Sequence, residues 1–156
     1  MKKILLIGFI ALFLISCEQQ TNEIQKDAVL MKLSTHEQYE QDTSNDIKKK
    51  LRHHDELQKL LVVNEGKDIV VAFDVPHKHR FSLAKIEQEL KQQLDSDYPH
   101  RKITISTDEK ILLELGELEK DIHERNIDNQ ELKKRLQKII QLTTDEAKRK
   151  DLHEQI

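Results

Sequence analysis

The segment from Asp68 to Val75, with the sequence DIVVAFDV, constrains the fold more than any other part of this 156-residue chain. It is rich in β-branched and aromatic residues, and its side chains alternate with the period of a strand. Two sets of residues point to opposite sides: Ile69, Val71, Phe73 and Val75 to one, and Val70, Ala72 and Asp74 to the other. This is the clearest strand in the sequence.

Two further strands are predicted beside it. Leu60 to Val63 is apolar and β-branched, and the Gly-containing segment Asn64–Lys67 follows it as a turn, which predicts a hairpin with the clearest strand. Lys102 to Ser106 is a short strand with Ile103 and Ile105 on one side.

Apolar residues at helical spacing predict four amphipathic helices. These run from Ser44 or Asn45 to about Leu60, from Ser82 to Leu94 or Tyr98, from Thr107 or Asp108 through Ile122, and from Asp128 to about Leu142, with Thr144 as the cap of a charged tail. Few glycines and prolines, 3 and 2, favour such helices over an all-β sandwich.

The order helix, strand, strand, helix, strand, helix, helix places the chain in the α+β class. We expect a small mixed β-sheet of about three strands, covered on one face by amphipathic helices, with a C-terminal helical extension. A right-handed crossover from Asp68 to Ser106 would bring its two strands side by side or nearly so. The extension has one apolar seam, formed by Leu132, Leu136, Ile139 and Ile140. We favour packing of this seam on the domain over a role in binding a partner.

The N-terminus has the pattern of an export signal. Lys2 and Lys3 precede an apolar run of about 12 residues, which is shorter than the roughly 20 residues of a membrane-spanning helix. The run ends in Leu14-Ile15-Ser16-Cys17, a lipobox. We therefore predict a lipoprotein signal peptide over residues 1–16 and lipid attachment at Cys17; the alternative is a plain secretory signal with a coincidental cysteine.

Lipidation would consume the only cysteine, so the mature chain would have no disulfide, thiolate nucleophile or cysteine metal site. We expect a protein held by lipid on the extracytoplasmic face of the cell membrane. Residues 17–44 would be a polar tether, 45–127 the α+β domain, and 128–156 a charged C-terminal helix and tail.

Loss of Lys2 and Lys3 changes the net charge from −3 to −5, which argues against nucleic acid or anionic lipid as the main partner.

Few residues suggest a metal-binding or catalytic site. His77 and His79 would share a side of an extended segment and are the best metal candidate, but an exposed loop after Pro76 is the favoured interpretation. His53 and His54 diverge on a predicted helix, and the remaining histidines are isolated in polar segments: His36, His100, His123 and His153. No metal site and no cofactor are predicted.

Ser106-Thr107-Asp108 places a hydroxyl beside an acid, but these residues are better explained as the cap of the following helix. The acidic residues Glu114, Glu117 and Glu119 are expected on a solvated helix surface. With no catalytic constellation predicted, the chain is expected not to be an enzyme.

The lipobox, the polar spacer, the strand IVVAFDV and the segment Lys102–Asp108, KITISTD, together resemble the YhcN/YlaJ-type sporulation lipoproteins of endospore-forming bacteria. The resemblance covers about Asp46 to Asn126 plus the lipobox. It departs at Phe73, an aromatic later in the strand than is usual, and at Glu109, where a proline is frequent. The resemblance implies a small α/β domain similar to BON domains, a role in spore formation or germination, and no catalytic residues.

These observations predict a membrane-anchored, non-enzymatic sporulation lipoprotein that acts as a binding or structural module of the spore envelope. Its expected partners are the membrane, through the N-terminal lipid, and a spore-envelope protein or phospholipid, with the forespore membrane as one location. The alternative is a general cell-envelope lipoprotein that binds phospholipid or cell-wall components and is unrelated to sporulation. A metal-binding or hydrolytic lipoprotein is the third hypothesis and the least favoured.

Overall fold

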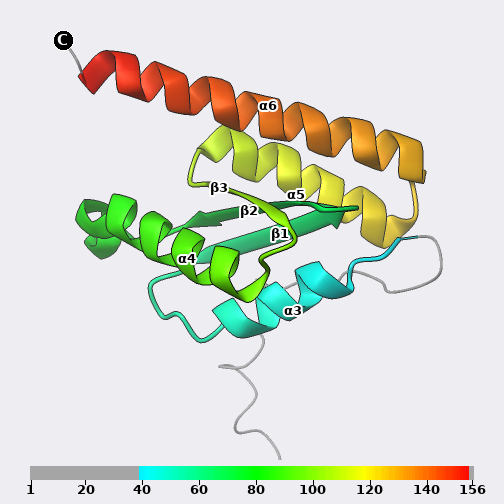
Figure 1. Cartoon of the computed structure of the whole chain (residues 1–156), viewed down its shortest axis with the longest axis horizontal. Coiled ribbons are helices and arrows are strands. Elements are labelled where there is room, and N and C mark those ends of the chain that lie inside the picture. Colours follow the sequence, from blue (N-terminus) through cyan, green and yellow to red (C-terminus); the bar gives the residue numbers. More distant parts are fainter. Residues whose placement is uncertain (1–38, 155–156) are drawn as a thin grey trace, which may run out of the picture.

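The computed structural model describes residues 39–154, with side chains as far as Arg149 (Figure 1). The predicted signal peptide, Cys17 and the tether up to residue 38 lie outside the described residues. The elements are α3 (Asp42–Leu51), β1 (Lys59–Glu65), β2 (Asp68–Asp74), the 3₁₀-helix η2 (His77–Ser82), α4 (Leu83–Asp97), β3 (Lys102–Ser106), α5 (Glu109–Glu124) and α6 (Asn129–Glu154).

The three strands form one mixed sheet in the order β1-β2-β3, with β1 antiparallel and β3 parallel to β2. The predicted α+β class is confirmed. The predicted hairpin is present, but β1 continues to Glu65, so the turn is shorter than expected and consists of Gly66 and Lys67. Gly66 has a φ of 55°, the positive value that a two-residue hairpin turn needs at its first position.

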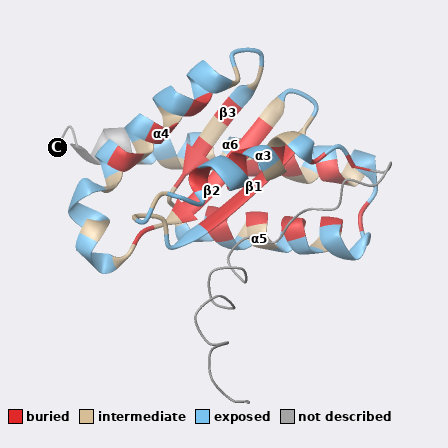
Figure 2. Cartoon of the chain, turned by 90° about the horizontal axis from the view of Figure 1, so that it is seen from below, coloured by how far each residue is buried: buried red, intermediate tan, exposed pale blue. Residues whose placement is uncertain are grey.

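Helices cover both faces of the sheet, whereas the sequence analysis expected one covered face. Figure 1 shows α5 and α6 above the sheet and α3 and α4 below it, and Figure 2 shows α3 crossing the lower face. Val70 and Ala72 of β2 pack in the upper core, and Ile69, Val71 and Phe73 in the lower core. All five are 0% exposed, which explains the difference: each side of β2 carries apolar residues that need a covering layer.

The first helix is shorter than predicted, because α3 ends at Leu51 and not near Leu60. Ile47 and Leu51 are buried, but Asp55, the next residue at helical spacing, is polar, so the apolar stripe stops. Leu57 packs against the lower core from the loop, and Leu60 belongs to β1. The predicted helix therefore combined one helix, one loop and the start of a strand.

The domain also begins earlier than predicted. Tyr39 and Gln41, which the sequence analysis placed in the tether, are 4% and 1% exposed, and Tyr39 packs in the upper core. Helix α3 starts at Asp42, and its N-cap residue Gln41 makes no capping hydrogen bond with its side chain. The N–H of Ser44 donates instead to Asn64 Oδ1 of β1, at 3.0 Å, so the cap comes from another element.

The last helix is longer than predicted and runs to Glu154. Its apolar seam belongs to the upper core, as favoured: Leu132, Leu136 and Ile139 are buried, and Ile140 is partly buried. Thr144 does not cap a separate tail, because its hydroxyl donates to the C=O of Ile140 within the helix, at 3.0 Å. None of the helices in residues 39–154 is both long enough and apolar enough to cross a membrane.

Candidate functional site

A hollow lies at the end of the sheet where β2 and β3 finish. Its volume is about 400 Å³, near the lower end of the range of small-ligand pockets, roughly 300–1,000 Å³. It is lined by Lys59, Asp74, Val75, Arg80, Leu83, Thr107, Glu109, Leu112 and Leu113. These residues come from the start of β1, the end of β2, the β2–α4 and β3–α5 connections, and the N-terminal parts of α4 and α5.

The topology explains why the hollow forms at this end. The chain leaves β2 for α4 on the lower face, and it leaves the parallel strand β3 for α5 on the upper face. When the chain turns to opposite faces after two neighbouring parallel strands, a crevice opens beyond their carboxyl ends. Asp74, which ends β2, and the predicted cap segment around Thr107 are brought together there.

The hollow carries charges of both signs. Lys59 at the start of β1 lies opposite Asp74 at the end of β2 in the strand register. Arg80 of η2 adds a second cation, and Glu109 at the start of α5 adds a second carboxylate. The Oδ1 atom of Asp74 accepts a hydrogen bond from the N–H of Val75 at 2.8 Å, which orients this carboxylate.

Apolar side chains complete the hollow. Val75 and Leu112 are buried beneath it, while Leu113 is 59% exposed. Phe81, adjacent to the lining residue Arg80, is 100% exposed. The lining contains no histidine or cysteine, and Thr107 supplies its only hydroxyl group. This arrangement suits the binding of a partly apolar ligand with charged groups better than it suits nucleophilic chemistry.

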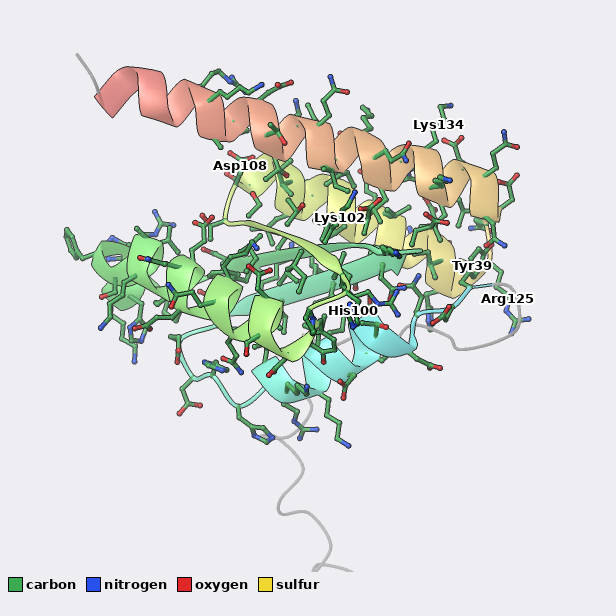
Figure 3. The ribbon with its side chains drawn as sticks, viewed as in Figure 1. Tyr39, His100, Lys102, Asp108, Arg125 and Lys134 are labelled. Carbon is green, nitrogen blue, oxygen red and sulfur yellow. The ribbon has the colours of Figure 1, made fainter. Side chains whose placement is uncertain are left out.

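The capping interpretation of Ser106-Thr107-Asp108 is confirmed. Asp108 Oδ1 accepts hydrogen bonds from the N–H groups of Lys110 and Ile111, at 2.9 and 3.2 Å, and Figure 3 shows it at the start of α5. Ser106 Oγ in turn accepts from the N–H of Asp108 at 3.2 Å. Both side chains are used in shaping the turn between β3 and α5.

The histidines are not brought together. His77 and His79 belong to a 3₁₀-helix, in which residues two apart point in different directions, so the extended arrangement considered for a shared ion is not formed. His53 and His54 lie in the turn after α3, where His54 Nδ1 donates to Glu56 Oε1 at 3.0 Å and lowers the pKa of Glu56.

The other histidines are equally dispersed. His100 and His123 are exposed, while His36 and the side chain of His153 lie outside the described part of the chain. Within that part, no group of three or more His, Cys, Asp or Glu residues is placed to hold a metal ion.

Of the three acidic residues expected on a solvated surface of α5, Glu119 is buried. Glu117 is exposed and Glu114 half-buried, but Glu119 is only 2% exposed. Its Oε1 atom lies 2.8 Å from Lys48 Nζ of α3, itself 4% exposed, and accepts a hydrogen bond from the N–H of Val62 in β1 at 2.7 Å. The carboxylate therefore joins α5, β1 and α3.

Burial perturbs both members of this pair. Desolvation raises the pKa of Glu119, which the charge of Lys48 opposes, and desolvation lowers the pKa of Lys48, which Glu119 opposes. Perturbed groups often mark catalytic sites, but neither residue lines the hollow. Their contacts with a strand edge indicate a structural role.

Comparisons with protein-family models, with curated proteins and with solved structures find no match to this chain. The similarity to sporulation lipoproteins remains a prediction from the sequence.

Replacing Lys48 by Met tests the role of the buried pair. The change leaves the Glu119 carboxylate buried without its partner, and we expect a loss of about 3–5 kcal/mol in the free energy of unfolding at pH 7, measured by urea denaturation. Loss of the Lys48 charge should raise the pKa of Glu119 further, so the loss of stability should shrink as the pH falls through this raised pKa toward the unfolded value of about 4.3.

Two variants control this experiment. Lys48→Met combined with Glu119→Gln removes both charges but keeps an oxygen that accepts from Val62, and it should recover most of the lost stability. Lys120→Met breaks an exposed ion pair with Glu124 and should cost less than about 1 kcal/mol. If Lys48→Met is no more destabilising than Lys120→Met, the pair does not have the role assigned to it.

Proposed function

We propose that this chain is a membrane-anchored, non-enzymatic binding module that contacts its ligand through the hollow at the ends of β2 and β3. The observation that carries the proposal is the composition of the hollow, which places two cations, two carboxylates and apolar side chains around one open cavity. Leu113 and Phe81 add exposed apolar surface on and beside its rim. Exposed apolar side chains beside a mixed-charge cavity favour recognition of another molecule.

The lipobox supports the membrane anchor. Diacylglycerol on Cys17 provides two acyl chains, enough for stable attachment where one chain is marginal. The segment between Cys17 and Tyr39 can span no more than about 75 Å even when fully extended. The domain would therefore act close to the extracytoplasmic face of the membrane.

The resemblance to sporulation lipoproteins supports a role in the spore envelope, in spore formation or germination. The ligand would then be a spore-envelope protein or a phospholipid, and the forespore membrane would be the site of action. Localisation of a tagged copy over time tests this part: a signal confined to the developing spore supports it. Expression throughout vegetative growth would favour a general cell-envelope lipoprotein instead.

Changing Cys17 to Ala should release the protein from its membrane. Without the thiol there is no attachment point for diacylglycerol, so the chain should move from the membrane fraction to the soluble fraction or remain as an unprocessed precursor. Fractionation and immunoblotting against the wild-type chain provide the measurement. Equal recovery of mature wild-type and Cys17→Ala protein in membranes would refute lipid anchoring.

Two substitutions in the hollow test the binding surface. Leu113→Asp and Arg80→Glu change exposed side chains, so the free energy of unfolding should change by only about 0.5 kcal/mol. Spore yield or germination should nevertheless fall to the level of a deletion strain.

Lys134→Glu is the matched control, because Lys134 is exposed on α6, away from the start of α5 (Figure 3). It should leave both readouts at wild-type values. If Leu113→Asp and Arg80→Glu fold normally and keep wild-type spore yield and germination, the hollow is not the binding surface.

A further inference from the structure

The two edges of the sheet, β1 and β3, differ in whether other parts of the chain bond to their outward backbone groups. At the β1 edge, buried side chains occupy three outward backbone groups: Glu119 accepts from the N–H of Val62, and the Gln41 amide bonds to both the N–H and the C=O of Asn64, at 3.2 and 2.6 Å. Because these groups are already bonded, this part of the edge is blocked to another strand.

The β3 edge has no such cover. Lys102 donates its N–H to Lys67 O at 2.8 Å, on the side of β2. Because backbone groups alternate in direction along a strand, the N–H and C=O groups of Ile103 and Ile105 point away from β2. No hydrogen bond within residues 39–149 uses these groups. Figure 1 looks toward this edge, and no other described element lies in front of β3.

We propose that the open edge of β3 pairs with the same edge of a second copy of this chain, antiparallel and centred on Thr104. In that register Ile103 of each copy lies opposite Ile105 of the other. Directly opposed outward residues exchange both of their hydrogen bonds, so every open N–H and C=O group of Ile103 and Ile105 would find a partner. In this self-pairing each isoleucine lies opposite an isoleucine and each threonine opposite a threonine. An unrelated strand would need the same order of residues to give these pairs.

Charge complementarity also favours a second copy. His100 and Arg101 precede the strand, Lys102 is its first residue, and Thr107-Asp108-Glu109 follow it. Antiparallel self-pairing brings the basic start of each strand toward the acidic end of the other. Lys102 and Glu109 are exposed and form no ion pair among the described residues, so both are free to contribute.

A cysteine at Thr104 tests the pairing in the full chain. Thr104 would face its own copy as a non-hydrogen-bonded pair, with Cα atoms about 4.5 Å apart, within the range that a disulfide spans. Membranes from cells that produce the Thr104→Cys chain should give a disulfide-linked homodimer on mild oxidation. We expect at least about tenfold more dimer than from the wild-type chain, which has only Cys17, or from Thr144→Cys on the exposed side of α6.

Charge reversal provides the second arm. In the Thr104→Cys chain, Lys102→Glu should lower the dimer yield severalfold, and adding Glu109→Lys should restore it, because both positions are exposed and the fold is retained. Dimer yield no higher than in the Thr144→Cys control, or a cross-link to a different protein, would overturn the proposal.

Discussion

The structure depends on how the edge of β1 is closed. The Glu119 carboxylate of α5 accepts from the outward N–H of Val62, and the Gln41 amide bonds to the outward N–H and C=O of Asn64. Lys48 of α3 neutralises the carboxylate. A helix from each side of the sheet therefore meets at one strand edge. Because a buried charge without its partner costs several kcal/mol, this cluster fixes the position of α3 relative to α5.

The second constraint is the two-sided apolar character of β2. Its central residues are buried on both faces, so the helices must divide into two layers, with α3 and α4 on one face and α5 and α6 on the other. The division makes the chain leave β2 and β3 in opposite directions. The hollow that we propose as the binding surface is a consequence of that topology, and its charges are those of residues at strand and helix ends.

Much of this fold was predictable from local patterns. The period-2 alternation identified β2, β3 was placed correctly at Lys102–Ser106, and the cap at Asp108 followed from its residue type. Contacts between distant segments were harder to foresee. The burial of Glu119 could have been suspected, since it lies four residues after Leu115 and three before Ile122 on the apolar stripe of α5. Its partner Lys48 is 71 residues away, and no local pattern joins the two.

Amide hydrogen exchange at the β1 edge tests the central claim most directly. Outward amides of an ordinary edge strand exchange through local opening. If buried side chains close this edge, the amides of Val62 and Asn64 should exchange only through global unfolding, with the same free energy as Val70 and Ala72 of β2. Exchange of Val62 and Asn64 that is faster by orders of magnitude than that of Val70 and Ala72 would contradict the account.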